Sequence, residues 1–158
     1  MYKIILKSNN TNDTIKIGSI LAKLLSIGDI VVLTGDLGAG KTKFVEGFLH
    51  NFGLQNEISS PTFNIVNEYI SSEKNIYHFD VYRLEDSDEF YAIGGEEYFE
   101  KGICLIEWGE LISDVLPKDY IHVTIHKDSN NENLRIFEFY VNDDSKYIEV
   151  LNKLKNPN

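Results

Sequence analysis

The sequence predicts an α/β fold in which a single domain is built around a mixed β-sheet flanked by helices. Apolar, strand-like runs alternate with helical patterns along the chain. The continuous apolar run Ile30–Thr34 is typical of a strand buried on both faces of a sheet. Near the C-terminal end, two alternating segments joined by the turn-rich sequence DSNNEN predict an antiparallel hairpin at one side of the sheet.

The strands are predicted from alternating or continuously apolar segments bounded by turn residues. In chain order, the expected strands are Tyr2–Leu6, Ile30–Thr34, Phe63–Ile70, Ile76–Tyr82, Ile103–Ile106, Tyr120–His126 and Leu134–Val141.

The helices are predicted from apolar residues at a spacing of three and four. The first follows the polar turn Asn9–Thr14 and is expected to end at Gly28. The second begins after Lys41 and ends before Gly53. The other helical segments are Asp86–Phe99, expected as one or two short helices broken at Gly94-Gly95, a short helix from Glu110 that stops before Pro117, and Ser145–Lys155.

The length and composition of the chain restrict its class. A chain of 158 residues has the size of one domain, so residues 1–158 are expected to form a single unit. A single cysteine excludes a disulfide framework and a four-cysteine metal site, and fits a reducing cytoplasm. No apolar run approaches the roughly 20 residues that span a bilayer. The N-terminal segment MYKIILKSNN is too short and polar for a secretory signal.

The negative net charge of the chain argues against direct binding to nucleic acid. The formal net charge is −10, and Arg83 and Arg135 are the only two arginines. Phosphate backbones are bound by clustered basic residues, which this chain does not have. The acidic clusters around Glu85–Glu89 and at Glu96-Glu97 are interpreted as a solvated face or as a docking face for a basic partner protein.

The segment from Gly35 to Thr42 matches the phosphate-binding pattern G-x-x-x-x-G-K-T, between an apolar strand and an amphipathic helix. Glycines bring backbone N–H groups close to an anion, and the following helix directs its positive end at the same place. Lys41 can reach the β- and γ-phosphates, and the hydroxyl of Thr42 can ligate Mg²⁺. The residues predicted to bind nucleotide are Gly35, Asp36, Leu37, Gly38, Ala39, Gly40, Lys41 and Thr42.

Two carboxylates are candidates to complete the metal site. Asp80 follows the apolar run NIYHF and Glu107 follows GICLI, which places both at the carboxyl ends of predicted strands. One of them can hold Mg²⁺ while the other orients the attacking water. The sequence leaves the division of these roles open.

Four further residues have both a structural and a functional interpretation, and a fifth, Cys104, has a structural one. Thr62, in the segment SSPTF, can lie near the γ-phosphate or simply in a loop. His78 is more often a packed, hydrogen-bonded residue than a base, and Arg83 can stabilise phosphate charge or pair with local acids. Trp108 is expected in the core rather than over the site. Cys104 is expected to be a small buried hydrophobic residue.

Three classes of phosphate-loop protein are consistent with the motif: a nucleotide hydrolase that acts on a partner, a small-molecule kinase, and a GTP-dependent switch. A kinase of this size usually has an arginine-rich lid, which two arginines cannot supply. No Asn-Lys-x-Asp segment for guanine recognition is present, so adenine is favoured. A hydrolase that acts on another protein fits best, and a nucleotide-gated binding module without hydrolysis is the alternative.

Several motifs occur together in a characteristic order: GDLGAGKTKF, SPTFNIVNEY, YHFDVYRL, EEYFEKGICLIEWGELI and LPKDYIHVTI. With these motifs the chain closely resembles the TsaE family, the bacterial ATPase component of the machinery that makes threonylcarbamoyladenosine in tRNA. The resemblance extends from about Thr14 to Phe139. It implies a small phosphate-loop α/β domain with a mixed sheet.

The resemblance also implies roles for individual residues. The loop Gly35–Thr42 binds ATP, Thr42 and Glu107 hold Mg²⁺, and Lys41 and Asp80 support hydrolysis. Thr62 belongs to a segment that resembles a nucleotide-sensing switch. Many family members have a second hydroxyl residue after the phosphate-loop threonine, where this chain has Lys43; we expect nucleotide binding to be retained there.

The partners implied by the resemblance are the enzyme that transfers threonylcarbamoyl to an adenosine beside the anticodon and that enzyme's paralogous companion. The ATPase is expected to reset this pair between turnovers, without holding the tRNA itself. That role agrees with the acidic charge of the chain.

Overall fold

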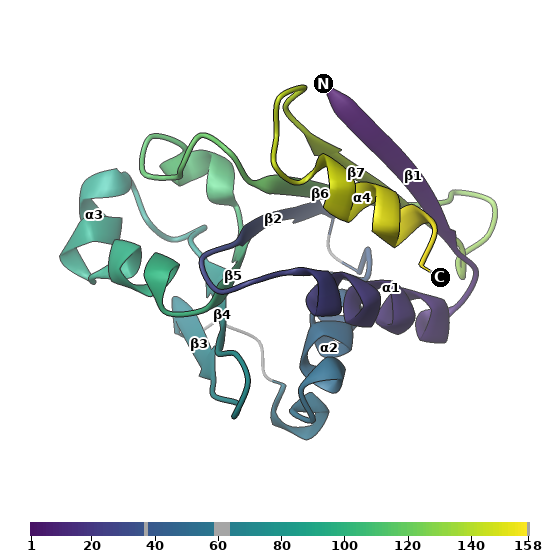
Figure 1. Ribbon diagram of the computed structural model, residues 1–158, viewed down its shortest axis with the longest axis horizontal. Helices are drawn as coiled ribbons and strands as arrows, with labels where there is room; N and C mark the ends of the chain where they lie inside the picture. Colours follow the sequence, from purple (N-terminus) through teal and green to yellow (C-terminus); the bar gives the residue numbers. More distant parts are fainter. Residues whose placement is uncertain (37, 59–63, 158) are drawn as a thin grey trace.

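A mixed seven-stranded sheet organises the computed structural model, which describes residues 1–36, 38–58 and 64–157 (Figure 1). The strands are β1 (Tyr2–Ser8), β2 (Ile30–Gly35), β3 (Val66–Tyr69), β4 (Ile76–Asp80), β5 (Ile103–Glu107), β6 (Ile121–Lys127) and β7 (Arg135–Val141). The α-helices are α1 (Thr11–Leu24), α2 (Lys41–Asn51), α3 (Ser87–Ala92) and α4 (Ile148–Lys155). The 3₁₀ helices in the described residues are η1 (Gln55–Glu57), η2 (Gly95–Glu100) and η3 (Gly109–Ile112).

The order of the strands is β1-β7-β6-β2-β5-β4-β3. The central strands β6, β2, β5 and β4 are parallel to one another, whereas β1, β7 and β3 pair with their neighbours in the antiparallel sense. In the register, Leu33 of β2 lies opposite Glu107 of β5, and Gly35 lies opposite Ile125 of β6. The carboxyl ends of the four parallel strands therefore meet at one edge of the sheet, which is where ligands bind in folds of this kind.

Helices cover both faces of the sheet, because successive residues of β2 belong alternately to two buried clusters that contain residues of different helices. Val31 and Leu33 belong to one buried cluster with residues of α1, α2 and α4, and Ile30 and Val32 belong to the other. The second cluster is closed by α3, η2 and η3, which lie apart from α1 and α2 (Figure 1). Because β2 is buried from both sides, it is a rigid base for the loop that follows it.

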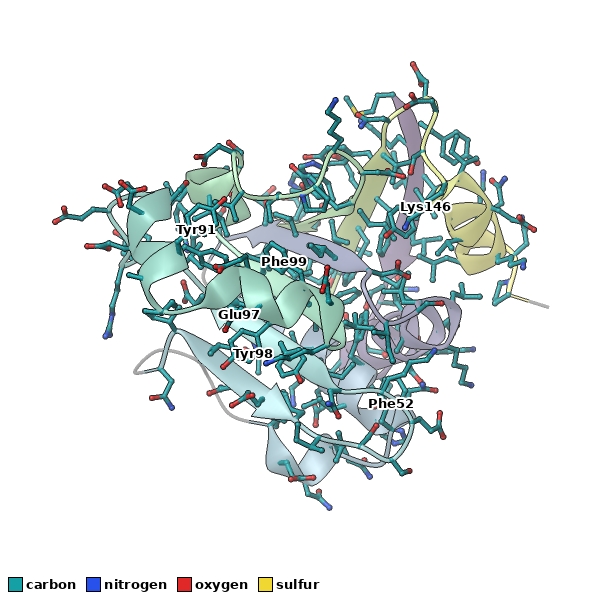
Figure 2. The ribbon with its side chains drawn as sticks, turned by 60° about the vertical axis from the view of Figure 1, so that its left-hand side comes forward. Phe52, Tyr91, Glu97, Tyr98, Phe99 and Lys146 are labelled. Atoms are coloured by element: carbon teal, nitrogen blue, oxygen red, sulfur yellow. The ribbon has the colours of Figure 1, made fainter. Side chains whose placement is uncertain are left out.

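Aromatic rings fill the second cluster. Tyr98, labelled in Figure 2, has its ring centroid 4.8 Å from that of Tyr77 and 5.6 Å from that of Phe79. The neighbouring Phe99 packs against Phe90 of α3 at a centroid distance of 5.8 Å (Figure 2). These contacts fix η2 and α3 on the sheet.

The helices α1 and α2 approach each other closely through two glycines. A Cβ atom added to Gly18 would lie 2.3 Å from the carbonyl oxygen of Phe44, and one added to Gly47 would lie 2.1 Å from that of Ile15. Real Cβ atoms do not approach backbone this closely, so both positions depend on glycine. The contact holds the body of α2, and with it the phosphate loop at its N-terminus, against α1.

The predicted fold class is confirmed, and several elements differ from the prediction in their bounds or type. Helix α1 ends at Leu24, whereas Gly28, with φ +100°, donates its N–H to the carbonyl of Gly102 in the turn before β2. The helix predicted from Glu110 is the 3₁₀ helix η3. The last helix begins at Ile148, because the hydroxyl of Ser145 accepts the N–H of Tyr147 and shapes a turn before it.

None of the described helices combines the length and the apolar character that crossing a bilayer requires.

Candidate nucleotide-binding site

The predicted phosphate loop lies between the end of β2 and the start of α2. Gly38 and Gly40 adopt left-handed backbone conformations, with φ values of +79° and +109°, which favour glycine. Gly40 occupies the N-cap position of α2, and no side chain of a described residue caps the helix there. The first amides of α2 are therefore available to an anion, at the positive end of the helix.

Lys41 and Glu107 meet at the entrance of α2. Nζ of Lys41 lies 3.2 Å from Oε1 of Glu107, and the two side chains are 19% and 12% exposed. The other carboxylate oxygen, Oε2, lies 2.8 Å from Nε2 of His78. The carboxylate at the end of β5 is thus held from two sides, by a lysine of the phosphate loop and by a histidine of β4.

Burial and these two partners act in opposite directions on Glu107. Burial raises the pKa of its carboxyl group, whereas the hydrogen bond and charge of His78 and the charge of Lys41 lower it. The favourable contacts outweigh burial, so that the pKa of Glu107 lies below its ordinary value. The group is therefore a carboxylate at neutral pH, the form that binds a metal ion.

Asp80 and Thr42 lie in the same cleft, which has a volume of about 970 Å³. Asp80 is paired with Glu107 in the register of β4 and β5, and its Oδ1 accepts the N–H of Tyr82 at 3.0 Å. Thr42 is exposed in the first turn of α2. One hydroxyl and two carboxylates around an open cleft suit Mg²⁺, which takes oxygen ligands and keeps sites for phosphate and water. The residues present therefore fit the expected metal.

The end of the β6–β7 hairpin contributes two basic residues that the motif did not reveal. Arg135 donates from Nε to the carbonyl of Ala39 at 3.0 Å and from Nη2 to that of Gly38 at 3.3 Å. Lys127 lines the cleft, and a Cβ atom added to Gly38 would lie 2.9 Å from its Nζ. The two residues are opposite each other in the β6–β7 register. They come from a distant part of the sequence, and no local motif marks them.

The structure brings together most of the predicted site residues. Gly35, Asp36, Gly38, Gly40, Lys41, Thr42, Asp80 and Glu107 all line the cleft. Ala39 is buried beneath it. Leu37 and Thr62 lie outside the described residues. Lys43 is half-exposed and pairs with Glu46 of its own helix at 3.2 Å.

Of the remaining candidate residues, two are buried and two are exposed. His78 is buried and contacts Glu107, while its Nδ1 is buried without a hydrogen-bond partner among the described residues. Cys104 is buried, as predicted, and burial raises the pKa of its thiol to about 12. The prediction that Trp108 packs in the core is wrong: it is 41% exposed, has φ +64°, lines the cleft, and packs against Tyr82 with the two rings tilted. Arg83 is exposed.

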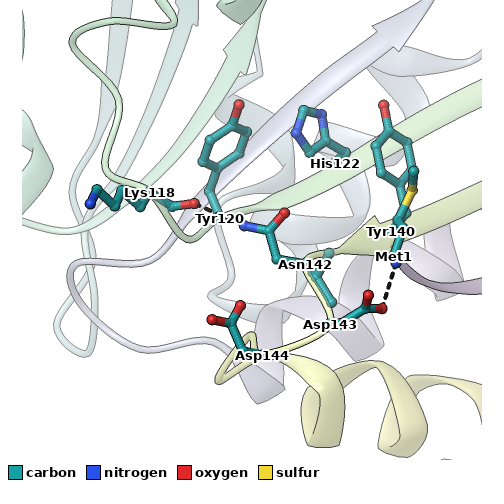
Figure 3. A pocket seen from close by; sticks show the side chains of 9 residues that line it. Met1, Lys118, Tyr120, His122, Tyr140, Asn142, Asp143 and Asp144 are labelled. Atoms are coloured by element: carbon teal, nitrogen blue, oxygen red, sulfur yellow. Dashed lines mark hydrogen bonds and ion pairs between the residues drawn. The ribbon is translucent and has the colours of Figure 1, made fainter.

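A second cleft lies at the opposite end of β6 (Figure 3). Its wall carries the rings of Tyr120, His122 and Tyr140, with successive centroids 4.5 Å apart. Asp143 and Asp144 also line it, and Asp143 pairs with the N-terminal ammonium group of Met1. The residues that line this cleft include no glycine and no residue of an α-helix, so the cleft at the glycine loop is the candidate nucleotide site.

Comparison with protein families matches residues 8–136 to the family described as "Threonylcarbamoyl adenosine biosynthesis protein TsaE". The chain belongs to the TsaE family. The TsaE protein of Bacillus subtilis is 40% identical over 124 residues, which cover 78% of this chain and 77% of that protein. The TsaE protein of Haemophilus influenzae is 43% identical over 123 residues, 77% of this chain and 78% of that protein.

The fold agrees with that of a solved structure. A crystal structure of Bacillus subtilis YdiB superposes with a TM-score of 0.77 and 29% sequence identity, covering 99% of this chain and 96% of that chain. The TsaE relatives from Bacillus and Haemophilus are both named as tRNA threonylcarbamoyladenosine biosynthesis proteins.

Proposed function

We propose that this TsaE-family protein is a magnesium-dependent ATPase that serves the threonylcarbamoyl modification of the adenosine next to the anticodon of tRNA. The observation that carries the ATPase proposal is the contact between Lys41 and Glu107 at the glycine loop. In this contact, the lysine proposed to bind phosphate lies beside the carboxylate proposed to bind the metal, where the ends of β2 and β5 meet. The family and the names of the relatives support the role in tRNA modification.

We assign each residue of the cleft a separate role in hydrolysis. The loop amides and Lys41 hold the β- and γ-phosphates, and Lys41 exchanges its contact with Glu107 for the phosphate. Glu107, oriented by His78, and Thr42 would hold Mg²⁺, which would supply positive charge to neutralise the phosphates. Asp80, on the neighbouring strand, orients the attacking water. Thr62 is proposed to sense the γ-phosphate.

The proposed partner is the threonylcarbamoyl-transferase pair rather than tRNA. A net charge of −10 disfavours binding to a polyanion. With two arginines, one of which is bonded to loop carbonyls, the chain has few groups to stabilise the transition state alone. We therefore expect slow hydrolysis by the isolated protein and faster hydrolysis in the presence of the transferase pair. The proposed location is the cytoplasm.

Release of phosphate from ATP and Mg²⁺, with and without the transferase pair, tests this proposal. Slow release that the pair accelerates, and that disappears in the Glu107→Ala variant, would support it. The alternative is a binding module that uses nucleotide only to shape its docking surface. Nucleotide binding without phosphate release under either condition would favour that module.

A further inference from the structure

We infer that Lys127 binds the α-phosphate, at the nucleoside end of the nucleotide. It does so on the opposite side of β2 from the metal site. The inference rests on the proposed ATP-binding function and extends it to a part of the cleft that the glycine-loop motif does not describe. It follows from the order of the strands, from the position of Lys127 against Gly38, and from the pairing of the other lysines.

The order of the strands predicts the orientation of the bound nucleotide. Strand β2 lies between β5 and β6, and β4 lies beyond β5. Glu107 and Asp80 end β5 and β4, so the metal and the γ-phosphate belong on that side of the loop. A polyphosphate bound by the loop of β2 therefore extends toward β6 with its other end. The α-phosphate and the nucleoside then lie over the end of β6, where Lys127 stands.

Lys127 is placed against the phosphate loop by the sheet. Parallel pairing of β6 with β2 brings Ile125 opposite Gly35, and Lys127 follows two residues later at the carboxyl end of β6. Its Nζ lies so close to Gly38 that an added Cβ atom would be 2.9 Å away. Lys127 and Gly38 line the same cleft. The ammonium group is thus beside the loop that encloses the phosphates.

The charge of Lys127 is available to a ligand. Lys41 pairs with Glu107 at 3.2 Å, and Lys43 pairs with Glu46 at 3.2 Å. Lys127, in contrast, forms no ion pair with any carboxylate in the described part of the chain. A phosphate in the cleft can therefore meet this cation without breaking an existing ion pair.

Titration calorimetry with MgADP and MgATP tests the assignment. Lys127→Met is expected to weaken the binding of MgADP and of MgATP by the same factor, about tenfold, because both nucleotides carry the α-phosphate. Lys127→Arg keeps the charge and is expected to restore most of the affinity. Lys118→Met is the matched control: it makes the same change of charge at an exposed position lining the second cleft, at the other end of β6.

The outcomes separate the inference from the function on which it rests. If Lys127→Met and Lys118→Met both bind the nucleotides as tightly as the wild type does, the assignment is overturned and the ATPase proposal stands. A loss confined to MgATP would place Lys127 at the γ-phosphate and also overturn it. A wild-type chain that binds neither nucleotide would overturn the proposed function and the inference together.

Discussion

Replacing Glu107 by glutamine is the perturbation that separates the charge at the site from its shape. The side chain is 12% exposed, its Oε1 lies 3.2 Å from Nζ of Lys41, and its Oε2 lies 2.8 Å from Nε2 of His78. Glutamine preserves the size of the side chain and removes its charge. Lys41, itself only 19% exposed, then has no ion-pair partner among the residues that the structure describes.

The expected loss of stability follows from these contacts. Hydrogen bonds to charged groups contribute about 1.5–3 kcal/mol, and breaking a fully buried ion pair costs about 3–5 kcal/mol. The glutamine amide still offers both partners a hydrogen bond, and the cleft is open to water. We therefore expect the free energy of unfolding of the nucleotide-free protein to fall by about 1–2 kcal/mol.

Urea unfolding with and without MgATP measures this effect. Glu149→Gln is the matched control, because Glu149 forms an exposed ion pair with Lys153 at 3.6 Å; its loss should change the stability by no more than about 0.5 kcal/mol. MgATP should stabilise the wild type and the control more than Glu107→Gln. Equal losses of stability in the two variants, or undiminished stabilisation of Glu107→Gln by MgATP, would refute the reasoning.

Three further predictions concern the loop, the thiol and the helix contact. Arg135→Met should weaken MgATP binding severalfold in calorimetry, because the carbonyls of Gly38 and Ala39 lose their donor, and an unchanged affinity would show that the loop holds itself. Burial favours the protonated thiol of Cys104, so its contribution to stability is complete below about pH 9 and is lost as the pH rises through about 12; iodoacetamide should label the native protein far more slowly than the urea-unfolded one. Gly47→Ala should lower the unfolding free energy by about 1–3 kcal/mol in urea titrations, since the added Cβ meets backbone, whereas Lys16→Ala on the exposed face of α1 should not.

The sequence predicts well what local signals encode. The glycine loop, the buried strand β2 and the carboxylates that end β4 and β5 each follow from a short run of residues. Periodicity likewise identified the hairpin of β6 and β7. These features can be predicted because glycine spacing and hydrophobic periodicity are encoded in neighbouring residues.

Contacts between distant segments were beyond such signals. Arg135 is 96 positions from Ala39, and only the sheet order brings β7 behind the phosphate loop. The contact between His78 and Glu107 likewise depends on β4 and β5 being neighbours. Trp108 follows an apolar strand and is predicted in the core, yet it has a left-handed backbone at the N-cap of η3 and is exposed. Tertiary geometry, rather than residue type, decides these three cases.

Calorimetric titration of the protein with MgATP, beside the Lys41→Ala variant, tests most directly whether the glycine loop is a nucleotide site. We expect the wild type to bind, and the variant to lose about 2–3 kcal/mol of binding free energy with its charge-assisted phosphate contact. An absence of binding heat in the wild type, or the same affinity in the variant, would contradict the account.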